Sequence, residues 1–218
     1  MLFFIDTADI NEIRSLADTG LVDGVTTNPT LFAKAGGDFK KLIGQICEIV
    51  SGPVSAEVAS TEFTTMLAEG RELARIAPNI AVKVPMTPDG LKACKTLSEE
   101  GIMINVTLCF SAAQAILAAK SGAAFISPFI GRLDDIGQDG MQLVRDIVTI
   151  YRQYQYFGTK VLAASIRGPL HVVDAAKAGA DIATIPPAAI RKLFVHPLTK
   201  AGVDTFVKDW ARTGQSIM

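Results

Sequence analysis

A single lysine interrupts an otherwise apolar stretch of the sequence. Lys83 lies within Ile80–Pro85, where all the other residues are apolar. A buried ammonium group is costly, and burial favours the neutral amine, which is the form that attacks a carbonyl carbon to give an imine. Lysine rarely lies in a buried strand unless it is paired or functional. Lys83 is therefore a candidate Schiff-base nucleophile. The alternatives are a lysine that extends to solvent from the strand end or one that pairs with a carboxylate.

Two carboxylates lie at the ends of other apolar stretches. Asp6 ends the first stretch of the chain, and Glu57 lies near the end of the third. Carboxylates close to an amine can serve as separate general acids and bases. The alternative for Asp6 is that it, or Asp9, caps the first helix. The alternative for Glu57 is a plain salt bridge to Lys83.

Uncharged side chains near the ends of further stretches are candidates for contacting a polyhydroxylated ligand. They are Asn28, Asn105, Thr107, Ser127 and Phe129. Because alternate residues of a strand share a face, Asn105 points to the same side as Thr107, and Ser127 to the same side as Phe129. Isolated Asn, Thr and Ser residues are also common in turns and at strand ends, which is the alternative here.

Two arginines follow later stretches and suit an anionic ligand. Arg132 comes after Phe129, and Arg167 follows Ser165 at a spacing of two residues. The planar guanidinium group binds phosphate oxygens through two parallel hydrogen bonds, and the Ser165 hydroxyl could assist. The alternative is that the arginines pair at the surface with nearby carboxylates, namely Asp134, Asp135 or Asp139.

The elements that must position these residues alternate along the chain. Short β-branched stretches, each followed by a segment of helical periodicity, are typical of βαβ units and a parallel sheet. We predict strands over Leu2–Asp6, Gly24–Asn28, Val54–Val58, Ile80–Pro85, Met103–Leu108, Ala124–Phe129, Lys160–Ser165 and Asp181–Pro186. We predict helices over Asp9–Ala17, Phe39–Val50, Glu62–Ile76, Pro88–Ser98, Ser111–Lys120, Met141–Phe157, Pro169–Lys177 and Pro187–Leu193.

Eight such units predict a (β/α)8 TIM barrel that forms one domain over residues 1–218. Its strand ends would bring the candidate residues to one mouth. An open doubly wound sheet is the alternative fold, but no strand is followed by a Gly-rich dinucleotide loop. Asp9, Thr61 and Ser111 are expected at helix starts. A final amphipathic helix, residues 199–213, is expected to pack on the barrel or on a neighbouring subunit.

Composition excludes several classes of protein. The net charge is −1 and the basic residues form no cluster, which argues against a nucleic-acid partner. With two histidines and no cluster of cysteines or carboxylates, we expect no metal. Three separated cysteines suit reduced thiols in the cytoplasm. The first apolar run is too short for a signal peptide, and no stretch is long enough to span a bilayer, so we expect a soluble cytoplasmic protein.

Six short segments, in chain order, resemble the motifs of transaldolases. They are Phe4–Ala8, Gly24–Thr30, Val82–Pro85, Asn105–Leu108, Ile126–Arg132 and Ala164–Arg167, and the similarity continues through Gly179–Pro186. The short chain and its C-terminal helix resemble the small-subunit branch of this family, which also contains fructose-6-phosphate aldolases. The resemblance implies a cofactor-free enzyme of the pentose phosphate pathway that acts on sugar phosphates and assembles into pentamers or decamers.

Carried over by position, the resemblance implies a role for each candidate residue. Lys83 would form the Schiff base with a ketose phosphate, and Asp6 would take the proton that triggers cleavage of the carbon–carbon bond. Glu57 and Thr107 would hold a catalytic water. The remaining residues would bind the substrate: Asn28, Asn105 and Ser127 the hydroxyls of the dihydroxyacetone fragment, and Arg132, Ser165 and Arg167 the phosphate.

Two positions separate the two activities of this branch. With Glu57 and Phe129 the chain resembles the transaldolases of this branch. The resemblance implies Gln and Tyr at these two positions in the aldolases. A tyrosine hydroxyl could protonate the carbanionic intermediate and release dihydroxyacetone, and phenylalanine has no such proton. The resemblance thus favours a transaldolase. The alternatives are a fructose-6-phosphate aldolase, a deoxyribose-phosphate-type aldolase, and a catalytically silent barrel that binds sugar phosphates.

Overall fold

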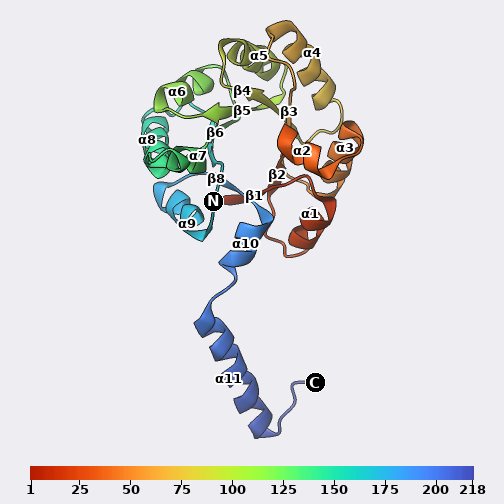
Figure 1. Cartoon of the computed structure of the whole chain (residues 1–218), viewed down its shortest axis with the longest axis vertical. Helices are drawn as coiled ribbons and strands as arrows, with labels where there is room; N and C mark the ends of the chain where they lie inside the picture. Colours follow the sequence, from red (N-terminus) through yellow and green to blue (C-terminus); the bar gives the residue numbers. More distant parts are fainter.

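Eight parallel strands close into a barrel in which each strand pairs with the next along the chain and β8 pairs with β1. The computed structural model describes residues 1–218 and shows this barrel end-on in Figure 1. The strands are β1 (Leu2–Asp6), β2 (Gly24–Thr26), β3 (Val54–Glu57), β4 (Ile80–Pro85), β5 (Met103–Cys109), β6 (Phe125–Pro128), β7 (Lys160–Ala163) and β8 (Ile182–Ile185). The predicted TIM-barrel fold is confirmed, and the doubly wound alternative is wrong.

Helices surround the barrel on its outer face (Figure 1). The helices of the chain are α1 (Ile10–Ala17), α2 (Pro29–Ala35), α3 (Phe39–Ile49), α4 (Phe63–Ala74), α5 (Pro88–Glu99), α6 (Ala112–Lys120), α7 (Ile130–Asp135), α8 (Gly140–Gln153), α9 (Pro169–Ala178), α10 (Pro187–Leu193) and α11 (Pro197–Thr213), of which α11 does not surround the barrel. All eight predicted helices and the C-terminal helix are present, and α2 and α7 are additional. Both additional helices directly follow a strand that ends at the barrel mouth.

Side-chain caps fix where several helices begin. The Asp9 carboxylate accepts hydrogen bonds from the backbone N–H groups of Asn11 and Glu12 at the start of α1. Ser111 caps α6 in the same way. At α4 the predicted Thr61 cap is wrong, because the cap is Glu62, whose carboxylate reaches the first turn. These caps satisfy N–H groups that have no partner within the helix.

Two apolar layers hold the barrel together. The larger one lies between the strands and the surrounding helices, and a smaller cluster contains Phe4, Ala81, Phe125 and Leu162. Phe4, Ala81 and Phe125 each lie two residues before Asp6, Lys83 and Ser127 on the same strand. Since alternate residues of a strand share a face, this smaller cluster fills the barrel interior beneath the candidate site.

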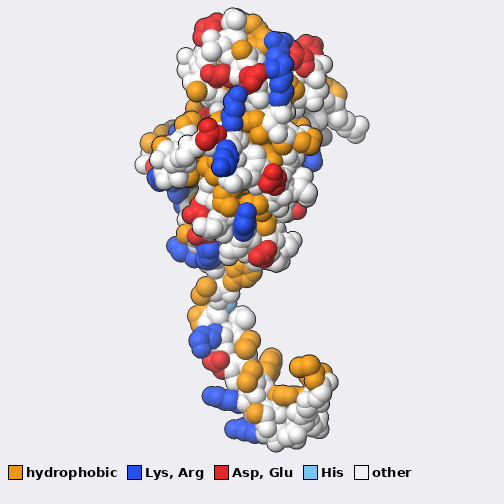
Figure 2. All heavy atoms as spheres, turned by 90° about the vertical axis from the view of Figure 1, so that its right-hand side faces the viewer, with side chains coloured by type: hydrophobic (Ala, Val, Ile, Leu, Met, Phe, Trp, Pro, Cys, Tyr) orange, Lys and Arg blue, Asp and Glu red, His pale blue; other side chains and the backbone are white.

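Helix α11 projects away from the barrel rather than packing on it (Figure 1). None of its residues is buried, and Phe206 is 74% exposed. Figure 2 shows hydrophobic side chains along this projecting segment. Of the two expected arrangements, packing on the barrel or on a neighbouring subunit, the first is therefore wrong. No helix of the structure combines the length and the apolar character that crossing a membrane requires.

Candidate active site

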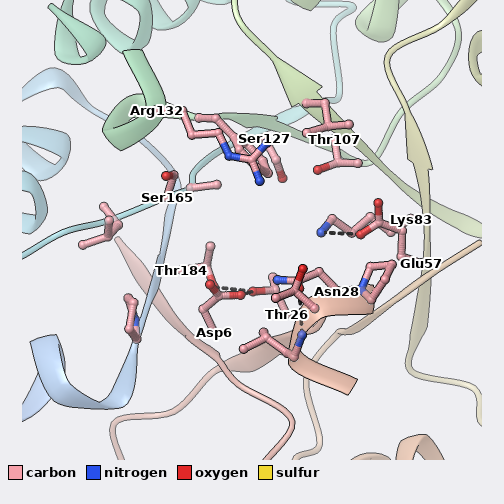
Figure 3. A pocket seen from close by; sticks show the side chains of 18 of the residues that line it. Asp6, Thr26, Asn28, Glu57, Lys83, Thr107, Ser127, Arg132, Ser165 and Thr184 are labelled. Carbon is pink, nitrogen blue, oxygen red and sulfur yellow. Dashed lines mark hydrogen bonds and ion pairs between the residues drawn. The ribbon is translucent and has the colours of Figure 1, made fainter. Parts of the chain in front are cut away.

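A cavity of about 500 Å³ opens at the carboxyl ends of the strands. Ten of the eleven residues singled out from the sequence line it: Asp6, Asn28, Glu57, Lys83, Thr107, Ser127, Phe129, Arg132, Ser165 and Arg167. Figure 3 shows side chains from strands all around the barrel pointing into this space. No three His, Cys, Asp or Glu side chains lie close enough together to hold a metal ion.

Lys83 is 5% exposed and sits deep in the cavity wall. Its ammonium nitrogen lies 2.9 Å from a carboxylate oxygen of Glu57, and it donates a hydrogen bond of 3.2 Å to the backbone carbonyl of Thr27. Glu57 stands beside Lys83 because the two residues are register partners on β3 and β4. The ion pair that was the alternative interpretation is present (Figure 3), and it holds the amine inside the cavity.

Asp6 lies at the end of a chain of hydroxyl groups. Burial raises the pKa of the Asp6 carboxyl, while a hydrogen bond from Thr26 and the charge of Lys83 lower it. The Thr26 hydroxyl donates to Asp6 over 2.8 Å and lies 2.5 Å from the Thr184 hydroxyl. Because the Thr26 proton is directed to Asp6, Thr184 donates to Thr26. The first helix is capped by Asp9, so Asp6 has no capping role.

Sequence reasoning missed both Thr26 and Thr184, although each lines the cavity. Thr26 lies two residues before Asn28, so strand alternation already placed it on the candidate face. Lys34 of α2 was also missed and lines the cavity. Nothing in the sequence around Lys34 marked it, because α2 itself was not predicted.

Beneath the cavity a second polar network links three strands. Asn105 is fully buried and does not line the cavity; its amide nitrogen donates to Ser55 over 3.1 Å, and its oxygen accepts from the Ser127 hydroxyl over 2.7 Å. Asn105 therefore orients Ser127 from below. Thr107, also fully buried, has a hydroxyl without any hydrogen-bond partner in the protein. A buried hydroxyl of this kind is available to a ligand or a water.

Asn28 has a structural function besides its place in the cavity wall. Its side-chain oxygen accepts a hydrogen bond of 3.0 Å from the backbone N–H of Leu31, which caps α2. Pro29 supplies the first residue of that helix, where a missing N–H costs nothing. The cap holds Asn28 in place at the rim, with its amide nitrogen free to face the cavity.

The backbone is strained at two points of the cavity wall. Leu108 and Ser165 both have a φ of 61°, in the left-handed backbone region that residues other than glycine rarely adopt. At Leu108 the pairing of β5 with β6 also shifts register, between Val106 and Cys109. Such strain is concentrated at binding and catalytic sites, where the surrounding structure maintains it.

The two arginines differ in their surroundings. The Arg132 guanidinium lies over the Phe129 ring at 4.8 Å from its centre and forms none of the ion pairs of the structure. Arg167 forms an ion pair with Asp135, one of its alternative partners, yet it still lines the cavity. Asp139 pairs instead with Arg145. The Phe129 side of the cavity therefore carries positive charge, as a phosphate-binding wall requires.

A comparison with protein families gives this arrangement a context. The family described as Transaldolase/Fructose-6-phosphate aldolase matches the chain over residues 3–217. The chain belongs to this family. It is therefore a member of a family of enzymes, and the resemblance stated from the sequence motifs is confirmed.

Relatives of the transaldolase type match the chain along its whole length. A probable transaldolase of Rhodospirillum centenum is 66% identical over 218 residues, which are 100% of this chain and 94% of that protein. A probable transaldolase of Parvibaculum lavamentivorans is 62% identical over the full length of both chains. One from a Caulobacter species is 60% identical, again over both full lengths.

Proposed function

We propose that this chain is a transaldolase that moves a dihydroxyacetone unit from a ketose phosphate to an aldose phosphate through a Schiff base on Lys83. The observation that carries the proposal is the position of the Lys83 amine, which is buried beside Glu57 in a cavity that Asp6 also lines. Donors of this kind are fructose 6-phosphate and sedoheptulose 7-phosphate. The whole-length similarity to probable transaldolases supports the same activity.

In the first step the Lys83 amine adds to the ketose carbonyl. The ammonium must lose a proton first, and the Glu57 carboxylate at 2.9 Å is placed to accept it. A carbon–nitrogen bond then forms, and the resulting carbinolamine loses its hydroxyl group as water. Glu57 returns the proton to that leaving hydroxyl through a water held with Thr107. The unpartnered Thr107 hydroxyl supports this role.

In the second step the bond between C3 and C4 breaks. The Asp6 carboxylate removes the proton from the C4 hydroxyl, the C4 oxygen becomes the carbonyl of the departing aldose phosphate, and the electron pair moves into the protonated imine. Burial raises the pKa of Asp6, which makes its carboxylate a stronger base for this transfer. Thr26 orients the carboxylate through the hydrogen bond of 2.8 Å.

In the third step an aldose phosphate enters and these reactions run in reverse. The three-carbon fragment must persist on Lys83 until then. Phe129 favours this outcome, because its ring lines the cavity but carries no hydroxyl that could protonate the fragment. The fragment is held by Asn28 and Ser127, with Asn105 acting through Ser127, and the phosphate by Arg132, Ser165 and Arg167.

Two assays test the proposal together. The protein is incubated with fructose 6-phosphate and erythrose 4-phosphate, and sedoheptulose 7-phosphate is measured; formation of this product is expected. Fructose 6-phosphate alone should give little free dihydroxyacetone, and substantial release would instead identify an aldolase. A deoxyribose-phosphate-type aldolase would accept acetaldehyde as donor, and a silent barrel would turn over neither substrate.

Borohydride trapping tests the nucleophile directly. Reduction in the presence of fructose 6-phosphate should leave a stable adduct on the peptide that contains Lys83. Mapping the adduct to another lysine, or finding none while the enzyme turns over, would refute the mechanism.

We also propose that the protein works in the pentose phosphate pathway of the cytoplasm as a homo-oligomer, a pentamer or decamer, with each chain folding as one domain over residues 1–218. Three free cysteines support a reducing compartment. The exposed apolar side chains of α11 support packing against a neighbouring subunit, since such a surface is costly in water. Light scattering of the purified protein measures the assembly.

A further inference from the structure

The loop after β7 carries two residues of the proposed phosphate site, and it is not held by ordinary helix capping. Ser165 has a left-handed backbone with φ of 61°. The N-cap residue of the following helix α9 is Gly168, which provides no side-chain cap. A strained segment persists only where its surroundings maintain it, so other groups must fix the loop that presents Ser165 and Arg167.

His171, in the first turn of α9, is one of these groups. Its Nδ1 accepts a hydrogen bond of 3.1 Å from the backbone N–H of Arg167. Its Nε2 lies 2.9 Å from a carboxylate oxygen of Asp134 on α7. Since Nδ1 accepts, the ring proton is on Nε2 and is donated to Asp134, so the imidazole bridges the loop and α7.

Asp134 is itself held in place, so the bridge has a fixed end. Its other carboxylate oxygen accepts a hydrogen bond of 2.9 Å from the backbone N–H of Gly140, at the start of α8. The neighbouring Asp135 pairs with the Arg167 side chain. Adjacent carboxylates of α7 therefore fix the loop at two points, one through His171 and one directly.

The packing of α7 against the loop leaves no room for adjustment. A methyl group added at Gly131 would lie 2.1 Å from the backbone carbonyl of Ser165 and 2.7 Å from the side chain of Arg167. Arg132, the next residue, lines the same cavity from α7. The loop and α7 thus form one wall, and the His171 bridge sets the position of one half of it relative to the other.

We propose that His171 is a positioning residue for phosphate binding. It fixes the Ser165–Arg167 segment against α7, so that the loop and α7 together bind one phosphate group. The inference rests on the proposed function only in taking a sugar phosphate as the ligand. His171 does not line the cavity, so it acts through Arg167 and Ser165.

The test compares His171→Ala with His171→Asn. Asparagine can place its side-chain oxygen where Nδ1 lies and so retain the hydrogen bond from Arg167, whereas alanine cannot. We expect His171→Ala to raise the KM for fructose 6-phosphate about tenfold, as for the loss of one hydrogen bond, with kcat changed less than about twofold. His171→Asn keeps the hydrogen bond from Arg167 but cannot reach Asp134, so it should recover part of this loss. For unphosphorylated fructose, kcat/KM should be the same in both variants and in the wild type.

His196→Ala is the matched control. His196 also accepts a backbone N–H through Nδ1, from Leu198 at the start of α11, but Leu198, unlike Arg167, does not line the cavity. This variant should leave the KM for fructose 6-phosphate unchanged. Equal losses for fructose and fructose 6-phosphate in His171→Ala, or no rescue by His171→Asn, would overturn the inference.

A binding measurement separates this inference from the proposed function. Calorimetry with inorganic phosphate should show weaker binding to His171→Ala than to the wild type, and amide hydrogen exchange at Arg167 should be faster in the variant. If the wild type binds phosphate but turns over no sugar, the proposed function fails while these two comparisons still test His171. Equal phosphate affinity in the two proteins would refute the positioning role.

Discussion

Replacing Lys83 by methionine should separate its catalytic role from its part in a buried ion pair. Methionine has a similar volume but no amine, so no imine can form, and turnover should fall by about a million-fold, as when other enzymes lose their nucleophile. The same change leaves Glu57, whose side chain is 15% exposed, without its cation at 2.9 Å.

The cost in stability can be worked out from this geometry. Removing one partner of a buried ion pair destabilises a protein by about 3–5 kcal/mol. Because the Glu57 side chain is still 15% exposed, the lower end of this range applies. We therefore expect a loss of about 3 kcal/mol, or about 6–12 °C in melting temperature for a chain of this size.

The double variant Lys83→Met/Glu57→Gln removes the stranded charge, so it should recover most of the stability at about pH 7 while staying inactive.

Scanning calorimetry of the wild type, both single variants and the double variant at neutral pH measures these differences alongside turnover. Normal turnover in Lys83→Met would refute the nucleophile. A melting temperature equal to that of the wild type at neutral pH would show that the ion pair does not stabilise the fold.

Three further predictions follow from the site and the projecting helix. Phe129→Tyr should increase the release of free dihydroxyacetone from fructose 6-phosphate, and an unchanged product ratio would remove our account of Phe129. Thr26→Val deletes the hydrogen bond that lowers the pKa of Asp6, so the acidic limb of the kcat/KM profile should move to higher pH; a limb that stays in place would show that Asp6 is not the titrating base. Phe206→Asp puts a charge on the exposed apolar side of α11, and light scattering should then show smaller assemblies; an unchanged mass would argue against a subunit contact through α11.

The strands could be predicted well because each is a short, largely apolar run that the barrel buries. Their carboxyl ends were harder to place. Asn28 was expected to end a strand, but it caps α2. No residue of α2 is buried, so no apolar periodicity predicted that helix. Helix α7 has only six residues and no capping side chain. Short helices that follow a strand directly leave almost no pattern in the sequence.

The convergence of the site residues was predictable from strand alternation, but their hydrogen bonds were not. Thr26 and Thr184 read as ordinary β-formers, since threonine is common in strands. The sequence offered three carboxylates as partners for Arg167. The position of each residue on α7 determines that the partner is Asp135. Nothing in the sequence marks His171, because the fold alone brings it to its partners Arg167 and Asp134. The amphipathic pattern of α11 likewise shows which side is apolar but not what covers it.

The hydrogen bonds made within the cavity wall also determine which ligand groups it can recognise. The only proton of the Ser127 hydroxyl is committed to Asn105, so toward the cavity Ser127 can only accept. The side-chain oxygen of Asn28 is committed to Leu31, so Asn28 offers only N–H donors. A sugar carbon facing Ser127 must therefore carry a hydroxyl, and a deoxy or methoxy analogue at that carbon would leave a lone pair without a donor. The cavity wall therefore selects a ligand by whether each of its groups donates or accepts a hydrogen bond, as well as by where the group lies.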